Sequence, residues 1–204
     1  MSEQDLPAAP LRRAEVYAVG FLRQGRAGWD EPHTRVVVYY AQALATAAGV
    51  DPLVAVTVAW LHDIGYAGLC AREDSSRHTV VKSRKALHME RGAALAREFV
   101  AQPDVAPFYT PAQRDRIVHL VGVHDNVEAL SAPDEIVFME ADTLGAVDIH
   151  RVTPTYDYKS GLRYLESVRR RRAPRFATSL GRQYLAELLP AFAAYLEARH
   201  QAGA

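Results

Sequence analysis

Helix start signals that contain proline recur along the chain and constrain its fold more than any other feature. Asp51-Pro52 combines a capping carboxylate with proline in the first helical turn. Thr110-Pro111-Ala112-Gln113 adds the glutamine of a capping box, and Ser131-Ala132-Pro133-Asp134 has a similar form. Between these points the apolar residues keep a helical spacing, so we predict an all-α fold.

The remaining segments also favour helices. Residues 11–26 place apolar side chains among arginines, and residues 33–48 keep a helical spacing despite the strand-like run RVVVYY. Residues 176–199 predict a final amphipathic helix that Pro190 kinks. With 204 residues, 49% of them hydrophobic, the chain can bury the core of one helical-bundle domain.

The composition limits where the protein acts. Its 24 basic and 24 acidic residues cancel, which argues against nucleic-acid or membrane binding driven by net charge. Cys70 is the only cysteine, the N-terminus lacks a signal peptide, and no apolar run reaches the roughly 18 residues of a spanning helix. We therefore expect a cytoplasmic protein with a disordered lead-in at residues 1–10 and one domain at residues 11–204.

Residues 67–87 interrupt the helical pattern with a polar, basic and weakly periodic segment. A structureless segment of this length in a compact domain is usually functional or disordered, so we predict a loop or a lid. The arginines at 169–172 are instead predicted to form a solvated face. Four cations in or beside the predicted lid would hold the charge of a phosphorylated substrate: Lys82, Arg84, Lys85 and Arg91.

Histidines and aspartates that could bind a metal lie at or near the ends of the predicted helices. The helices of a bundle can direct such positions into one shared cavity. Imidazole and carboxylate ligands suit Mn, Fe, Co, Ni or Zn, and the lack of cysteine ligands argues against a structural zinc. The candidates are His33, His62, Asp63, His88, His124, Asp125 and Asp142.

Helix geometry decides which of these residues can share an ion. His62 and Asp63 are neighbours, which point about 100° apart on a regular helix. Both reach one ion only where the helix ends or distorts, and Gly65 predicts such an end. Alternatively, His62 only complements the dipole of its helix. His119 and His124 point about 140° apart, so we do not expect both to serve one metal. His124 is the candidate, and we expect His119 to be a buried, hydrogen-bonded residue.

Several segments, in the right order, resemble the HD-domain superfamily of metal-dependent phosphohydrolases, in a bacterial hydrolase subgroup. WDEPHTRVV is similar to the helix of the first histidine, and the HD of AWLHDIGY to the pair that names the superfamily. HMERGAALAREF and RIVHLVGVHDN are similar to two later histidine segments, and EADTLGAVDIHR to the stretch with the last aspartate. The resemblance covers roughly residues 29–151, with EAD where the subgroup often has DAD, and says little about the C-terminal helices at 152–200.

The resemblance implies a set of ligands for one divalent cation, and two cations are the alternative. It also adds Mg to the possible metals. His88, His124 and Asp125 are then candidates for a second metal site or for phosphate binding. The same three residues are the catalytic candidates, because Asp125 could activate a water and the two histidines could protonate a leaving group. The ligands of the first cation would be His33, His62, Asp63 and Asp142.

Two of these ligands have local alternatives. His33 follows a proline and could merely flank its helix while Asp30 or Glu31 serves as the ligand. Asp142 could be an ordinary solvent-facing acid, and if it faces the site then Glu140, two residues away, must face elsewhere.

The implied function is hydrolysis of a small phosphorylated substrate, a nucleotide by family habit, through a metal-bound hydroxide. Two alternatives remain open at this point: a binuclear iron oxygenase on the same ligands, and a non-catalytic HD domain that binds a nucleotide. The expected partner is a small molecule, without a membrane or nucleic acid. A homodimer through the final helices is an open alternative.

Overall fold

The computed structural model describes residues 6–69 and 83–202 and, over these ranges, is helical without any strand, which confirms the predicted all-α bundle. Most of the predicted lid lies outside the described residues. Short helical turns that matter below are η1 (Ile64–Tyr66) and the π-helical η4 (Val168–Arg172). The α-helices are α1 (Ala8–Leu22), α2 (Asp30–Ala48), α3 (Pro52–Leu61), α5 (Lys85–Ala101), α6 (Pro111–Val123), α7 (Pro133–Val147), α8 (Tyr158–Ser167) and α9 (Ser179–Ala202).

Two of the three helix start signals act as their sequences predict. The Asp51 side chain accepts two backbone N–H groups at the start of α3. Thr110 and Gln113 form a reciprocal capping box at the start of α6. At α7 the N-cap is Ala132, which has no polar side chain, and Glu135 accepts its backbone N–H at 3.0 Å instead. These bonds satisfy N–H groups that the first helical turn leaves without partners.

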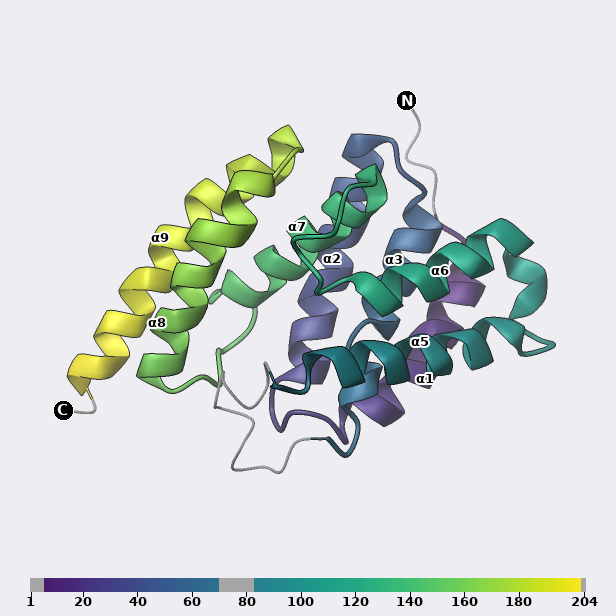
Figure 1. The fold of residues 1–204 in the computed structure, drawn as a ribbon, viewed down its shortest axis with the longest axis horizontal. Helices are drawn as coiled ribbons and strands as arrows, with labels where there is room; N and C mark the ends of the chain where they lie inside the picture. Colours follow the sequence, from purple (N-terminus) through teal and green to yellow (C-terminus); the bar gives the residue numbers. More distant parts are fainter. Residues whose placement is uncertain (1–5, 70–82, 203–204) are drawn as a thin grey trace.

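The helices α2 and α7 pack along each other at the centre of the molecule (Figure 1). α3 lies against α2, α1 against α3, and α5 pairs with α6 on that side. α8 and α9 form a second pair at the opposite end, which contacts the rest mainly through α7 (Figure 1). One buried apolar cluster nevertheless continues from Leu22 in α1 through Phe138 in α7 to Phe192 in α9.

A buried carboxylate fastens the start of α9 to the central helices. Glu140 of α7 accepts the backbone N–H groups of Ala177 at 2.5 Å and Thr178 at 3.0 Å, and also the Thr178 hydroxyl. Glu140 therefore points to the start of α9, and Asp142 lies on a different face of α7, as helix geometry predicts. None of the helices in the described ranges has the length and apolar character needed to cross a bilayer.

Candidate metal centre

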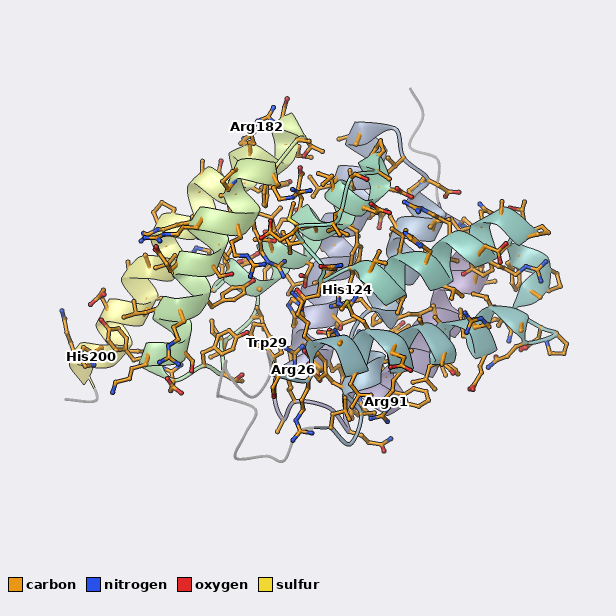
Figure 2. The ribbon with its side chains drawn as sticks, in the orientation of Figure 1. Arg26, Trp29, Arg91, His124, Arg182 and His200 are labelled. Atoms are coloured by element: carbon orange, nitrogen blue, oxygen red, sulfur yellow. The ribbon has the colours of Figure 1, made fainter. Side chains whose placement is uncertain are left out.

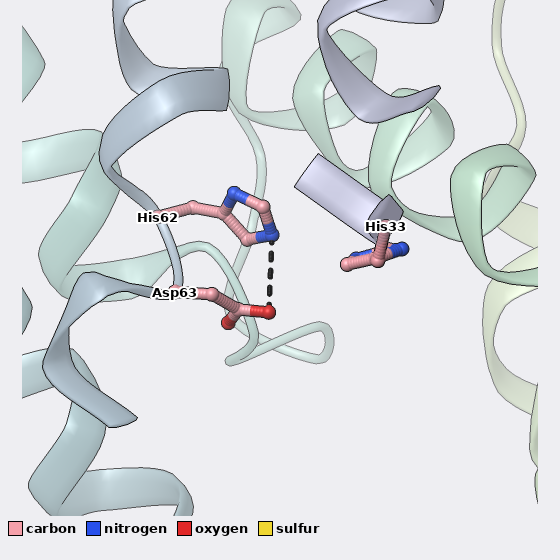
Figure 3. Close-up of side chains that lie close together, drawn as sticks. All are labelled: His33, His62 and Asp63. Atoms are coloured by element: carbon pink, nitrogen blue, oxygen red, sulfur yellow. Dashed lines mark ion pairs between the residues drawn. The ribbon is translucent and has the colours of Figure 1, made fainter. Parts of the chain in front are cut away.

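The helix α3 ends at the two neighbouring candidate ligands, which must reach the same point in space if they share an ion. His62 still has helical backbone angles, but Asp63 has φ −102° and ψ 2° and leaves the helix. The two side chains then converge, with His62 Nε2 3.3 Å from Asp63 Oδ2 (Figure 3). The helix therefore ends at this pair, as it must if both side chains are to reach one ion.

Gly65 contributes by close packing and not by stopping the helix. Its φ is not positive, and a Cβ added to it would lie 1.9 Å from the carbonyl oxygen of His88 and 2.7 Å from the backbone nitrogen of Gly92. The prediction of a helix-stopping glycine is therefore wrong. Only a glycine lets η1 approach α5 this closely, and this approach brings His88 to the HD pair.

We expect Gly65→Ala to lower the free energy of unfolding by about 2–3 kcal/mol, because backbone atoms cannot yield to the new methyl group. Urea unfolding measures this change. Gly20→Ala in α1 is the matched control, since a Cβ there meets no atom within 4 Å. The control should be neutral or stabilising by up to about 1 kcal/mol. Equal effects of the two substitutions would show that the close approach is not needed.

One set of ligand atoms comes from His33, His62 and Asp63, which all lie within 4.8 Å of one another. Asp142 joins this set, because its Oδ1 lies 3.1 Å from His33 Nε2 and 3.8 Å from His62 Nε2. The four residues predicted as metal ligands therefore meet in space, although they come from α2, α7 and the end of α3. His33, not its neighbour Asp30, is the α2 residue in this set.

A second set of ligand atoms shares Asp63 with the first and adds His88 from α5 and His124 from the end of α6. Asp63 Oδ1 lies 3.7 Å from His88 Nε2 and 3.8 Å from His124 Nε2. These two nitrogens lie 3.3 Å apart. Asp63 thus stands between the two sets, with Oδ2 toward His62 and Oδ1 toward the other histidines.

Backbone carbonyls fix the direction of two of the imidazoles. His62 Nδ1 donates to the carbonyl oxygen of Ala59 at 2.8 Å, and His124 Nδ1 donates to that of Val121 at 2.9 Å. Both Nε2 atoms are thereby aimed at the shared space, as in metal sites where the second nitrogen is held by a carbonyl. His62 Nε2 is buried and has no hydrogen-bond partner among the described residues, a cost that a bound cation removes.

The electrostatics of the site favour a cation at its centre. Burial alone would lower the pKa of His62, but the carboxylates of Asp63 and Asp142 outweigh it and raise this pKa to about 9. Burial, with a contribution from His124, lowers the pKa of His88 to about 3. Burial also lowers the pKa of His124, with a contribution from His62. His88 and His124 are therefore neutral, the form of histidine that binds metals.

Arg172 holds two of the candidate site carboxylates, and the sequence did not single it out. It is 7% exposed and donates to Asp142 Oδ2 at 2.8 Å and to Asp125 Oδ1 at 2.6 Å. Burial raises the pKa of Asp142, but the bond from His33 and the charge of Arg172 outweigh it and hold this pKa well below its usual range. The prediction of a solvated arginine face is wrong for this residue, and nothing in a run of four arginines distinguishes it.

Arg26 holds the carboxylate of Asp63 in a similar way. Its backbone N–H and its Nε donate to Asp30 at 2.6 Å and 2.5 Å, and its Nη2 donates to Asp63 Oδ2. Its guanidinium also lies over the Tyr66 ring, 4.2 Å from the centroid. Asp30, an alternative ligand on sequence grounds, is therefore engaged by Arg26 and positions Asp63 through it.

The ligand sets open into a cleft of about 610 Å³, whose lining includes Arg26, Trp29 and His124 (Figure 2). Among the residues predicted to bind substrate, Lys85 lines this cleft and pairs with Asp125 Oδ2 at 3.2 Å. Arg84 does not line the cleft. Arg91 lines a separate hollow and donates to the Ala67 carbonyl. Lys82 lies outside the described residues.

His119 and His124 separate in the structure as their spacing predicts. The His124 residue is 3% exposed and belongs to the second ligand set. The His119 side chain is 47% exposed and hydrogen-bonded to Glu135 at 2.9 Å. The expectation of a hydrogen bond to His119 holds, but the expectation that it is buried is wrong, because α6 turns this face to solvent.

We expect His124→Ala to remove about one metal ion per chain and His119→Ala to remove none. His119→Ala is a matched control, because the two residues lie on one helix and only His124 faces the ligand sets. Elemental analysis of the purified variants gives the metal content. Equal metal loss in both variants, or none in either, would contradict the assignment of His124 to the second ligand set.

Comparison with known proteins gives no match, either to a protein-family model, to a curated protein or to a solved structure.

Proposed function

We propose that the protein is a metal-dependent phosphohydrolase that acts on a small phosphorylated molecule, and that it belongs to the HD-domain superfamily that its sequence resembles. The observation that carries the proposal is the position of Asp63 between two buried sets of ligand atoms beside a cleft lined by arginines. A nucleotide as the substrate rests on the resemblance alone.

The donor atoms fit a divalent transition metal. They are imidazole nitrogens and carboxylate oxygens, a mixture that suits Mn, Fe, Co, Ni or Zn better than Mg, which prefers oxygen ligands. The buried Nε2 of His62, which makes no hydrogen bond among the described residues and lies beside the carboxylates of Asp63 and Asp142, also supports the fit. One ion would be held by His33, His62, Asp63 and Asp142. A second would be held by Asp63, His88 and His124, and we therefore propose two ions, where the sequence led us to expect one.

Burial lowers the pKa of both His88 and His124, which favours a ligand role over a phosphate-binding role. A histidine binds phosphate oxygens best as a cation, and burial keeps both of these rings neutral. The cations of the cleft are instead lysine and arginine, which keep their charge. Lys85 is the cation of the predicted set that is placed to contact a phosphorylated substrate.

The chain's own groups prepare the site for hydrolysis. When bound, a divalent ion lowers the pKa of a coordinated water and neutralises charge on a phosphoryl group. Asp125 is held at the cleft wall by Arg172 and Lys85, where it can accept a hydrogen bond from the attacking water. The rings of Trp29, Tyr66, Tyr156 and Tyr164 line the same cleft and limit the access of bulk water.

The proposal is tested by metal analysis and a phosphatase assay. Protein purified after growth without added metal should contain about two divalent ions per chain. It should hydrolyse p-nitrophenyl phosphate, lose this activity on chelation and regain it with one of the metals above. A chain that binds no metal, or that binds metal without hydrolysing any phosphate ester in a broad panel, would overturn the proposal.

An oxygenase is the second candidate, because the second ligand set is made of neutral imidazoles around a shared carboxylate. Such a set also suits a pair of iron ions that react with oxygen. Two irons per chain, with substrate-dependent oxygen uptake and no phosphatase activity, would favour it. Nucleotide binding that persists without any metal would favour the non-catalytic alternative.

A further inference from the structure

One wall of the cleft is formed by α8 and η4, which lie outside the segments that resemble the HD-domain superfamily. This wall is strongly basic, with four arginines against one glutamate. The cleft is also larger than one phosphate group requires, since pockets of roughly 300–1,000 Å³ hold whole small molecules. The charged residues that this wall adds to the lining are Arg163, Glu166, Arg170, Arg171 and Arg172.

The π-helical backbone of η4 accounts for three consecutive arginines in one wall. On an α-helix, successive side chains point about 100° apart, so three in a row would spread over more than half of the helix circumference. A π-helix closes its hydrogen bonds five residues apart, and its wider turn places successive side chains closer in direction. Segments of this kind are uncommon and occur frequently at functional sites.

The arginines of this wall differ in how firmly they are engaged. Arg172 is buried and committed to Asp142 and Asp125. Arg171 pairs with Glu128 at 2.7 Å and Arg170 pairs with Glu166, but both pairs are solvent-exposed.

Exposed pairs contribute little stability and exchange readily, so a ligand can displace them. Arg163 is exposed, lines the cleft and forms no ion pair with any of the residues that the structure describes. This wall therefore has positive charge available to a ligand.

We propose that Arg163, Arg170 and Arg171 form a second phosphate subsite, so that the preferred substrates are small molecules with two separated phosphate groups. One phosphate would lie at the ligand sets and be hydrolysed, and this part rests on the proposed function. The other would be bound by the arginines, whose planar guanidinium groups match phosphate oxygens. The subsite contributes binding and leaves the chemical step unchanged.

The first experiment measures binding without metal. Isothermal titration of the chelated, dialysed full-length chain with hexanediol bisphosphate should give an affinity that falls about tenfold in the double variant Arg163→Ala/Arg170→Ala. Arg169→Ala is the matched control, because this exposed arginine belongs to the same run but does not line the cleft. The control should change the affinity by less than about twofold.

The second experiment compares hydrolysis of hexanediol bisphosphate and hexyl phosphate by the metal-loaded protein. The bisphosphate should have a kcat/KM about tenfold higher, through KM alone, and the double variant should lose this preference. The subsite would be overturned if the wild type had the same kcat/KM for the bisphosphate and for hexyl phosphate. It would also be overturned if the titrations gave the same affinity for the double variant and for Arg169→Ala. Selective binding without any hydrolysis would support the subsite and overturn the proposed phosphohydrolase.

Discussion

Asp63→Asn should empty both of the proposed metal sites at once. We expect the metal content to fall from about two ions to well below one ion per chain, and phosphatase kcat/KM to fall at least about 1,000-fold. The reason is that Asp63 belongs to both sets of ligand atoms, with one oxygen toward each. Asparagine keeps the shape of the side chain but removes the negative charge that offsets a divalent cation. Elemental analysis and p-nitrophenyl phosphate hydrolysis measure the two effects.

Asp115→Asn is the matched control for this substitution. Asp115 is exposed on α6, so its replacement should leave metal content and activity unchanged. Circular dichroism should show a helical fold for both variants, since Arg26 keeps Asp30 as a partner when Asp63 loses its charge. If Asp63→Asn still bound two ions with near wild-type activity, the shared carboxylate would not be a ligand.

Arg172→Met should destabilise the protein by about 3–5 kcal/mol, measured by urea unfolding of the metal-free chain. The substitution leaves two carboxylates, those of Asp142 and Asp125, without the guanidinium that neutralises them. The cost falls mainly on Asp142, whose side chain is 13% exposed and regains little water, because Asp125 keeps Lys85 as a partner. Methionine retains most of the apolar volume of the side chain, so the measured change reports mainly on charge.

Arg169→Met is the matched control for Arg172→Met, with the same substitution three residues earlier at an exposed position. Its effect should stay within about 0.5 kcal/mol. Arg172→Lys should be intermediate, because an ammonium group keeps the charge but cannot bind two carboxylates through separate nitrogens. If the two methionine variants were equally stable, Arg172 would be one more solvated arginine, as the sequence pattern predicts.

Local signals in the sequence were sufficient for most of the helices. Asp51 and the Thr110–Gln113 pair act on backbone groups within three residues of themselves, so their effect does not depend on the rest of the fold. The spacing of Glu140 and Asp142 also predicted that only one of them faces the site, because it puts them on different faces of α7, while the resemblance indicated that this one is Asp142. The resemblance of the histidine and aspartate segments indicated which residues would meet, and their distances bring the four together.

The residues that hold the candidate ligands in place could be identified only from the tertiary structure. Arg172 is 30 residues from Asp142 along the chain, and Arg26 is 37 residues from Asp63. Gly65 is needed because the backbone of α5 happens to pass against it. No periodicity or capping rule records such contacts, because each depends on how whole helices pack.

The sequence by itself thus determined most of the helices, the starts of α3 and α6, and the residue types that can hold a metal, since these follow from interactions between near neighbours in the chain. The tertiary structure decided which oxygen of Asp63 faces which histidines, which of four arginines is buried, and that α8 and η4 form the basic wall of the cleft. These features arise from packing between distant segments, where burial and charge neutralisation are decided jointly.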